Sequence, residues 1–142
     1  MTAPDRASSR PALIAFDWST VATVAALPAV RRAVTQWVDP LGLDEDEVGA
    51  LQVVVSELVA NAVEASRPDD LVSVRLIDRI DVVVVEVANP SGRSKPVPIP
   101  PMADPLASRG RGLAIVRSLS TGLVLAEVDG CTVARCEVPM SP

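Results

Sequence analysis

A run of valines near the middle of the chain restricts the fold more than any other feature of the sequence. Residues 82–87 read Val-Val-Val-Val-Glu-Val. β-Branched side chains favour extended backbone, and a strand that is apolar on both faces is typical of the buried centre of a sheet. We therefore expect residues 82–87 to form a central strand.

Hydrophobic periodicity and turn residues predict the elements around this strand. In chain order they are a strand at 13–18, helices at 27–38 and 44–66, strands at 72–77 and 82–87, a helix at 112–119, and strands at 123–128 and 132–138. Strands and helices do not alternate as they do in a doubly wound fold. We therefore expect an α/β (α+β) two-layer sandwich, in which a mixed, largely antiparallel sheet carries about three helices on one face.

The rest of the chain indicates a single domain with two irregular stretches. Residues 1–11 are rich in Pro, Ser, Ala and Arg, and we expect them to be a disordered tail before a domain at 12–142. Six prolines fall in the sixteen residues from Pro90 to Pro105, which prevents helix or ladder pairing over most of that length. We expect a long exposed loop there.

Charge and composition exclude several functions. The net charge is −5 and the isoelectric point about 4.6, so direct binding to nucleic acid or to an anionic membrane is not expected. No segment resembles a signal peptide or a membrane span, which makes the cytoplasm the expected location. The sequence has no histidine, which excludes a histidine triad, a histidine metal site and a phospho-accepting histidine in this chain. Cys131 and Cys136 have odd spacing in a predicted strand, so they should face opposite sides and form no disulfide.

A polar stripe runs along the long predicted helix. Asp44 and Glu47 form a capping-box pattern at its start, and Glu57, Asn61 and Glu64 recur at helical spacing further on. This spacing stacks a carboxylate and a carboxamide one turn apart, as a general base and a Mg²⁺ ligand at one site would require. Taken alone, the same pattern is more often the solvated side of an amphipathic helix.

A second motif, Ser-Arg-Gly-Arg-Gly-Leu at 108–113, comes directly before the short helix predicted at 112–119. Glycines at the start of a helix let backbone N–H groups approach phosphate oxygens, and the helix dipole favours an anion there. Arg109 and Arg111 can add positive charge. An isolated Gly-x-Gly is more often a turn, so the motif gains meaning only in combination with the polar stripe.

Together the two motifs resemble those of a known superfamily. Residues 54–62 (Val-Val-Ser-Glu-Leu-Val-Ala-Asn-Ala) are similar to the N box, and residues 110–116 (Gly-Arg-Gly-Leu-Ala-Ile-Val) to the later glycine box, of the GHKL ATPases. This superfamily includes gyrase, MutL, heat-shock chaperones and histidine kinases. Within it, the chain resembles the short bacterial anti-sigma factors and serine kinases. The resemblance runs from about Val24 to Pro139 and implies a histidine-kinase-like ATP-binding (Bergerat) fold.

The resemblance implies roles for individual residues. Asn61 matches the residue that ligates Mg²⁺, and Glu57 matches the general base that acts on a water or an acceptor hydroxyl. The ATP-binding residues expected in the glycine box are Arg109, Gly110, Arg111, Gly112 and Leu113. The cofactors implied are therefore ATP and Mg²⁺.

The adenine end departs from the family pattern. The family has an aspartate that accepts a hydrogen bond from the adenine amino group, followed by glycines, whereas Asn89 stands here in its place and Ser91 or Gly92 replaces the first glycine. An Asn carbonyl can accept this bond, but charge-assisted bonds are roughly twice as strong as neutral ones. Thr132 matches a threonine that supports the adenine end, and residues 90–108 match the mobile lid over the nucleotide.

Three functions stay open. The resemblance implies a regulator of the anti-sigma-factor type, which binds a sigma factor and phosphorylates a serine or threonine on an antagonist protein with Mg-ATP. The departure at Asn89 favours instead a nucleotide-binding regulatory module with weak or no kinase activity that sequesters a protein partner. The third is a detached ATP-binding subunit that donates phosphate to a histidine on another chain. Related proteins commonly pair through the N-terminal strand and helix, so a homodimer through residues 13–38 is compatible with the resemblance.

Overall fold

The computed structural model of the chain describes residues 14–90 and 108–141, with the backbone alone described for Ile14 and for residues 108–111. The predicted tail at 1–11, Gly92 and nearly all of the predicted lid at 90–108 lie outside the described residues. In the described part of the chain, no helix is long and apolar enough to cross a membrane.

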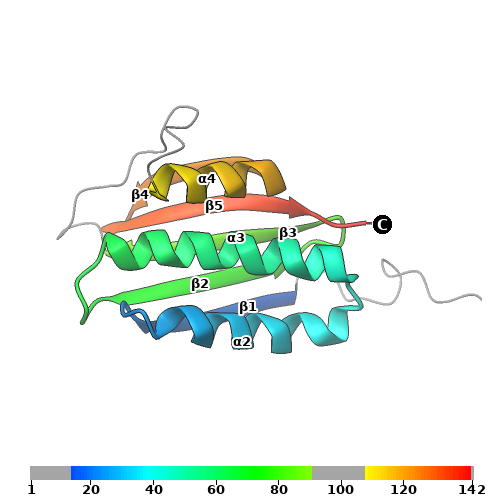
Figure 1. Cartoon of the computed structure of the whole chain (residues 1–142), viewed down its shortest axis with the longest axis horizontal. Coiled ribbons are helices and arrows are strands. Elements are labelled where there is room, and N and C mark those ends of the chain that lie inside the picture. The colour runs from blue at the N-terminus through cyan, green and yellow to red at the C-terminus, as the bar shows by residue number, and fades with distance from the viewer. Residues whose placement is uncertain (1–13, 91–107, 142) are drawn as a thin grey trace, which may run out of the picture.

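The described residues form two layers, a five-stranded sheet and a layer of helices in front of it (Figure 1). The elements are β1 (Ile14–Val21), α2 (Ala26–Val38), the short 3-10 helix η1 (Asp39–Leu41), α3 (Glu45–Glu64), β2 (Leu71–Asp78), β3 (Val82–Pro90), α4 (Ser108–Leu119), β4 (Thr121–Val128) and β5 (Cys131–Pro139). The strand order is β1-β2-β3-β5-β4, and each described pairing is antiparallel. The predicted two-layer sandwich is confirmed.

The valine run forms the middle strand of the sheet. β3 pairs with β2 on one edge and with β5 on the other, and Val83, Val84 and Val85 are all fully buried. Val83 and Val85 belong to the core under the helices, while Val84 points to the opposite side. Burial on both sides explains why the run can be apolar at every position.

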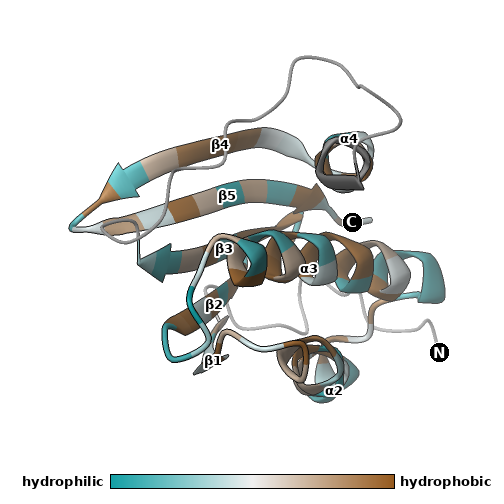
Figure 2. Cartoon of the chain, turned by 60° about the vertical axis from the view of Figure 1, so that its left-hand side comes forward, coloured by the Kyte–Doolittle hydropathy of each residue, from teal (hydrophilic) through white to brown (hydrophobic). Residues whose placement is uncertain are grey.

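The helices cover only one face of the sheet (Figures 1 and 2). Under them lies one core built from aliphatic side chains, among them Val30, Val34, Leu51, Val55, Leu58, Val74, Leu76, Val85, Val87 and Val116. Complete burial of a side chain of this size contributes roughly 1.5–3 kcal/mol. Since the chain has almost no aromatic residues, these contacts supply most of the hydrophobic stabilisation.

Local signals in the sequence define where the elements begin and turn. At the start of α3, Glu47 N donates to Asp44 Oδ1 (2.8 Å) and Asp44 N donates to Glu47 Oε1 (3.0 Å), so the predicted capping box is present. Between β4 and β5, Asp129 and Gly130 both have positive φ (51° and 78°), as a two-residue hairpin turn of type I′ requires.

Helix α4 begins earlier than the sequence indicated. It starts at Ser108 rather than at Gly112, so both glycines of the motif lie inside its first turns. Glycine disfavours the interior of a helix, but the first turn forms few intrahelical N–H bonds and tolerates it better. The glycines are therefore part of the helix N-terminus and do not precede it.

Alternation along the strands gives the sheet a second face, here called the open face, which points away from α2, α3 and α4. Its residues include Asp17, Arg75, Glu86 and Arg135, each flanked in sequence by residues that face the helices. Both cysteines are free: Cys136 is buried in the core, and Cys131 lies on the open face. Their predicted positions on opposite faces are confirmed.

Candidate functional site

The polar stripe of α3 is only partly a solvated surface. Glu57 and Asn61 are half-buried, whereas Glu64, one turn further on, is exposed. Helix α4 lies beside α3 and runs in the opposite direction, so its first turns lie toward the C-terminal half of α3 (Figure 1). That half carries Glu57 and Asn61. The fold thus brings the two motifs of the sequence to one end of the helix layer.

Glu57 links the two motifs, because its carboxylate lies close to Gly112 on α4. A Cβ atom built on Gly112 would lie 2.6 Å from Glu57 Oε2, which is shorter than any real carbon–oxygen contact of this kind. Only a glycine allows the carboxylate to occupy this position. The missing side chain at Gly112 therefore lets the Glu57 carboxylate lie close to α4.

Asn61 presents a buried oxygen atom that lacks a partner. Its Oδ1 has essentially no exposed surface and no hydrogen-bond partner among the described residues. Leaving a buried acceptor unsatisfied costs roughly 1–3 kcal/mol. A neutral amide oxygen is a normal ligand for Mg²⁺, so this atom fits the metal that the N box implies.

A magnesium ion here would need ligands besides this oxygen. No group of three or more His, Cys, Asp or Glu side chains in the described part of the chain could hold a metal ion. Mg²⁺ is commonly bound by one or two protein oxygens together with substrate phosphates and water. The donor set therefore fits a metal that arrives with a nucleotide.

The predicted adenine end is also assembled by the sheet. Asn89 on β3 pairs directly with Thr132 on β5, and their exposed fractions are only 5% and 8%. Both residues continue the rows that face the helices, after Val87 and before Ala134. Asn89 Nδ2 donates to the carbonyl of Pro90 at 3.2 Å. With the amide N–H engaged locally, Oδ1 is the atom suited to accept a bond from a ligand.

For the other predicted ATP-binding residues, the structure describes the backbone alone, a buried side chain, or nothing. Arg109, Gly110 and Arg111 lie in the first turns of α4, where free backbone N–H groups and the helix dipole favour an anion. Leu113 is buried in the core with Val116, so its side chain anchors α4 and only its backbone can face a ligand. Gly92 lies outside the described residues.

Sequence reasoning missed one contact beside the site. Ser56, the buried residue directly before Glu57, accepts a hydrogen bond from Arg31 Nε at 3.2 Å. This bond connects α2 to α3 next to the stripe. No local pattern announces it, because the two residues are far apart in sequence and either one alone is ordinary for a helix.

These observations define a class of protein. A two-layer sandwich in which an unsatisfied amide oxygen, a carboxylate, a helix N-terminus and a buried Asn–Thr pair gather at one end has the arrangement of a nucleotide-binding ATPase domain. The sequence profile of the histidine kinase-like ATPase domain matches residues 20–136. The chain therefore belongs to the histidine kinase-like ATPase family, for which nucleotide binding is implied.

Solved structures agree with this fold. The structure of the RsbU and RsbW domains of Rv1364c from Mycobacterium tuberculosis is similar, with a TM-score of 0.64 and 21% identity over 91% of this chain and 33% of that one. The chain thus spans about a third of the length of this neighbour. The catalytic domain of the histidine kinase ThkA has a TM-score of 0.55 and 17% identity over 89% of this chain and 99% of its own. At these identities the likeness shows the fold alone. No curated protein matches the chain.

Proposed function

We propose that this chain binds Mg-ATP between α3 and α4 and acts as a regulator of the anti-sigma-factor type, phosphorylating a serine or threonine on an antagonist protein. The observation that carries the proposal is the buried Oδ1 of Asn61, which has no hydrogen-bond partner among the described residues and lies one helical turn from the Glu57 carboxylate beside Gly112. The site presents a metal ligand and a proton acceptor side by side.

Each residue has a distinct task in this proposal. Asn61 Oδ1 and the nucleotide phosphates hold Mg²⁺, which supplies charge neutralisation at the phosphates. The N–H groups at the start of α4 bind phosphate oxygens. Glu57 accepts the proton of the acceptor hydroxyl, and the missing side chain at Gly112 leaves room for its carboxylate beside α4. Asn89 Oδ1 accepts from the adenine amino group, and Thr132 lies next to it.

Two observations support a protein hydroxyl as acceptor. The fold is similar to a structure that contains an RsbW domain, and the motifs resemble those of anti-sigma factors. The sequence also has no histidine, so none of its own residues can be a phospho-accepting histidine.

The alternative is a nucleotide-binding module that sequesters its partner without efficient transfer. Asn89 favours it, because a neutral amide replaces the charged acceptor of adenine. Weaker binding of adenine would reduce the time that ATP spends in the site. In this case the nucleotide would control the affinity for the partner and would not be consumed.

A titration with a fluorescent ATP analogue, with and without Mg²⁺, tests the site. Loss of an outer-shell partner typically lowers metal affinity 10–100-fold, so Asn61→Ala, which removes a direct ligand, should weaken Mg-dependent binding at least about 100-fold. The matched control is Gln52→Ala, because Gln52 also has a buried oxygen without a partner among the described residues and lies on the same helix. Equal binding by wild type and Asn61→Ala would reject the site.

Transfer is tested with γ-labelled ATP and the protein partner recovered from the native cell. An acid-stable label on the partner that disappears with Glu57→Gln supports a serine or threonine kinase. An acid-labile label indicates a histidine acceptor. Partner binding that depends on ATP without any label supports the sequestering module.

A further inference from the structure

Strand β4 lies at one edge of the sheet and is its most exposed strand. It is the last in the strand order and pairs with β5 on one side, and no strand within residues 14–90 and 108–141 lies along its other side (Figures 1 and 2). Six of its eight residues are exposed. Backbone N–H and C=O groups form strong hydrogen bonds, so an open edge of this kind can pair with another chain.

The turn that follows β4 determines which of its backbone groups point outward. The two-residue turn at 129–130 closes on a hydrogen-bonded pair, which includes Val128. Hydrogen-bonded and non-hydrogen-bonded pairs alternate along an antiparallel ladder, so Val128 and Ala126 direct their N–H and C=O groups toward β5. Glu127 and Leu125 therefore direct theirs to the free edge.

The edge is regular along this stretch. The irregularity in the ladder with β5 lies before Val124, and from Val124 to Val128 the register is continuous. These five residues include no proline and no lysine, two of the features that commonly protect the edge of a sheet. The outward N–H and C=O groups recur at every second residue, roughly 7 Å apart, as pairing with another strand requires.

The side chains of β4 favour an apolar neighbour on the open face. Val124 and Val128 are 51% and 50% exposed there, with Ala126 between them. On the other face, Leu125 is half-buried against the core and Glu127 is exposed. A strand added beside β4 would cover the two valines best with apolar side chains at alternate positions.

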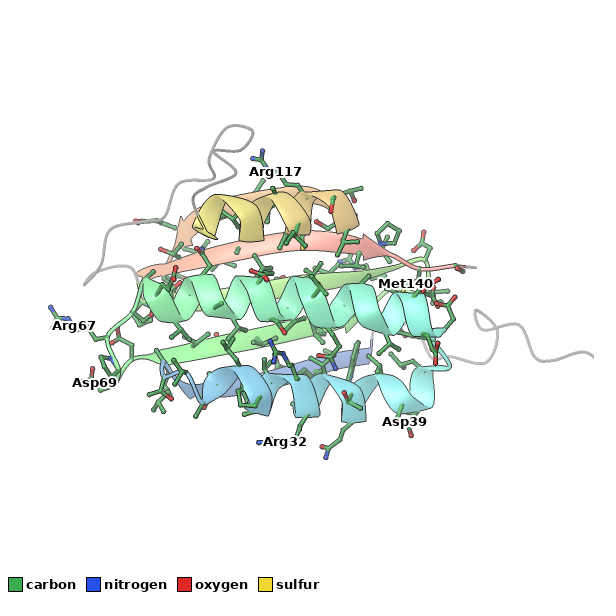
Figure 3. All side chains as sticks on the ribbon, in the orientation of Figure 1. Arg32, Asp39, Arg67, Asp69, Arg117 and Met140 are labelled. Atoms are coloured by element: carbon green, nitrogen blue, oxygen red, sulfur yellow. The ribbon has the colours of Figure 1, made fainter. Side chains whose placement is uncertain are left out.

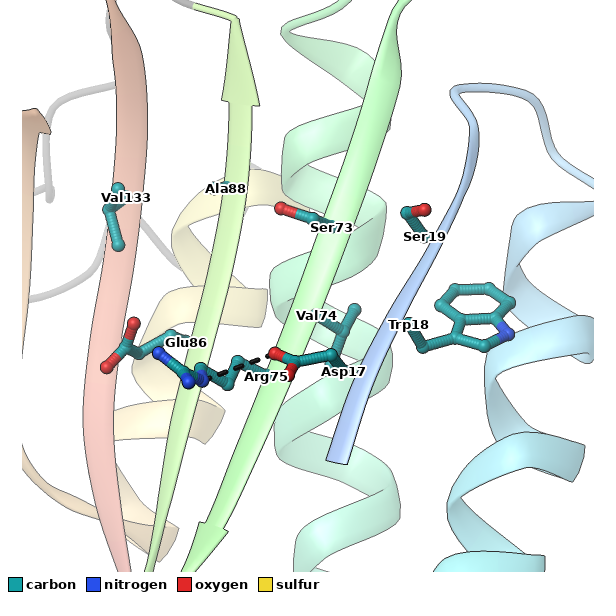
Figure 4. Close-up of a pocket in the computed structure, with 9 residues that line it drawn as sticks. All are labelled: Asp17, Trp18, Ser19, Ser73, Val74, Arg75, Glu86, Ala88 and Val133. Atoms are coloured by element: carbon teal, nitrogen blue, oxygen red, sulfur yellow. Dashed lines mark ion pairs between the residues drawn. The ribbon is translucent and has the colours of Figure 1, made fainter. Parts of the chain in front are cut away.

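The charged residues of the open face, by contrast, already pair within the chain. Arg75 Nε lies 3.2 Å from Asp17 Oδ1 (Figure 4), and Arg135 lies 3.8 Å from carboxylate oxygens of both Glu86 and Glu137. Among the described residues, the free edge of β4 is therefore better suited to a partner than these charges are.

Charge at the edge indicates what kind of chain fits it. Residues 121–130 contain two carboxylates, Glu127 and Asp129, and no cation, and neither carboxylate forms an ion pair with another described residue. A second copy of β4 would bring further carboxylates to this edge, and like charges on neighbouring strands are destabilising. A lysine or arginine opposite Glu127 forms a favourable pair instead. The edge therefore favours a different chain.

We propose that the free edge of β4 binds an extended segment of a partner protein, in which apolar residues alternate and a lysine or arginine lies opposite Glu127. The segment adds a further strand to the sheet. In strand addition of this kind, main-chain hydrogen bonds provide affinity and alternate side chains provide specificity. Binding requires neither ATP nor Mg²⁺, so it can be tested separately from the proposed function.

A calorimetric titration with the peptide Thr-Val-Thr-Val-Lys-Val-Thr-Val-Thr, without nucleotide, tests the proposal. The peptide reads the same in both directions, so it suits a parallel or an antiparallel strand. Methyl groups on the backbone nitrogens of Lys and Thr, or on those of Val, block one edge of the peptide each. One set should weaken binding at least about 10-fold, because several hydrogen bonds are lost, and the other should not. No binding, or an equal response to both sets, overturns the proposal.

Variants at Glu127 test the same edge from the side of the protein. Glu127→Pro removes an outward N–H and keeps the ladder with β5, so it should weaken binding at least about 10-fold. Glu127→Thr keeps the N–H and removes the charge, which should weaken binding no more than about 5-fold. Asp39→Asn, which removes an exposed carboxylate at the end of α2 (Figure 3), is the control and should bind like wild type. Equal binding by wild type and Glu127→Pro contradicts the proposal, and the methylated peptides decide if this variant does not fold.

Amide hydrogen exchange tests whether the edge is free before the peptide binds. In the chain alone, the amides of Leu125 and Glu127 should exchange faster than those of Ala126 and Val128, and the peptide should slow them. Slow exchange of all four amides in the chain alone would mean that another part of this chain or a second copy already covers the edge. That result would also overturn the proposal.

Discussion

The two faces of this sheet are made by the same strands but differ in composition and burial. Facing the helices, alternate residues are aliphatic and buried, as Val74 and Leu76 are on β2. Facing the other way, their neighbours Ser73 and Arg75 are small or charged and lie in rows across the sheet. A strand alternates by necessity, so each of its residues belongs to only one of these surfaces.

The difference also bears on the proposed nucleotide site. On β3 the row facing the helices runs Val83, Val85, Val87 and then Asn89, and on β5 the corresponding row begins with Thr132. The proposed site therefore lies at the end of the core, where an apolar row turns polar beneath α3 and α4. The open face is separated from it by the thickness of the sheet, so substitutions can alter one without touching the other.

The largest expected difference between the faces is in stability. Leu76→Ala should lower the free energy of unfolding by about 2–5 kcal/mol, because Leu76 is 0% exposed in the core. Leu71 lies on the same strand but is 59% exposed. Leu71→Ala should therefore lower the free energy of unfolding by no more than about 0.5 kcal/mol. Urea unfolding at one protein concentration measures both. Similar losses would mean that the open face is as well covered as the core.

A smaller effect is expected at the contact between Glu57 and Gly112. Gly112→Ala should displace the carboxylate and lower phosphoryl transfer on the order of 100-fold, since misplacing a catalytic group by about 1 Å has such an effect. The helix itself should not weaken, because alanine favours helix over glycine by about 1 kcal/mol. Transfer rates and thermal unfolding, measured on the same samples, separate the two effects.

Gly49 provides the control for this variant. It is also a helical glycine, but a Cβ atom there would have nothing within 4 Å. Gly49→Ala should therefore raise stability by up to about 1 kcal/mol and leave transfer unchanged. If Gly112→Ala behaves in the same way as Gly49→Ala, Glu57 has room to move and its position does not control the reaction.

Much of the fold follows from the sequence because its signals are local. The valine run, the capping box at Asp44 and the Asp129–Gly130 turn each act within a few residues, and each is found where expected. The predicted start of α4 was wrong because the motif was expected to precede the helix, whereas it lies in the helix's first turns. The cross-strand order of charges could not be predicted, because register between distant strands depends on the whole sheet.

The site was predictable in part for the same reason. The spacing of Glu57 and Asn61 is a helical pattern, whereas their burial depends on α4, whose approach no local pattern describes. The pairing of Asn89 with Thr132 needs the register of β3 on β5. The close approach of Glu57 to Gly112 is visible only when both helices are placed.

The smallest expected effect compares the two cysteines, one on each face. Burial raises the pKa of the Cys136 thiol, with a smaller opposing effect from the Ser120 hydroxyl. The folded protein therefore holds this proton more tightly than the unfolded chain does. Its contribution to stability is complete below the ordinary thiol pKa of about 8.5 and is lost as the pH rises through the higher value of the folded state.

Two measurements test the burial and the raised pKa of Cys136. The chain has no tyrosine and a single lysine, so few other groups titrate above pH 8, and urea unfolding there should show stability falling with pH. A thiol reagent at pH 8 should modify half-exposed Cys131 quickly and Cys136 slowly, and Cys131→Ser should remove only the fast reaction. Equal rates for both thiols would mean that the core under the helices opens as readily as the other face of the sheet. The distinction between the two faces would then be lost.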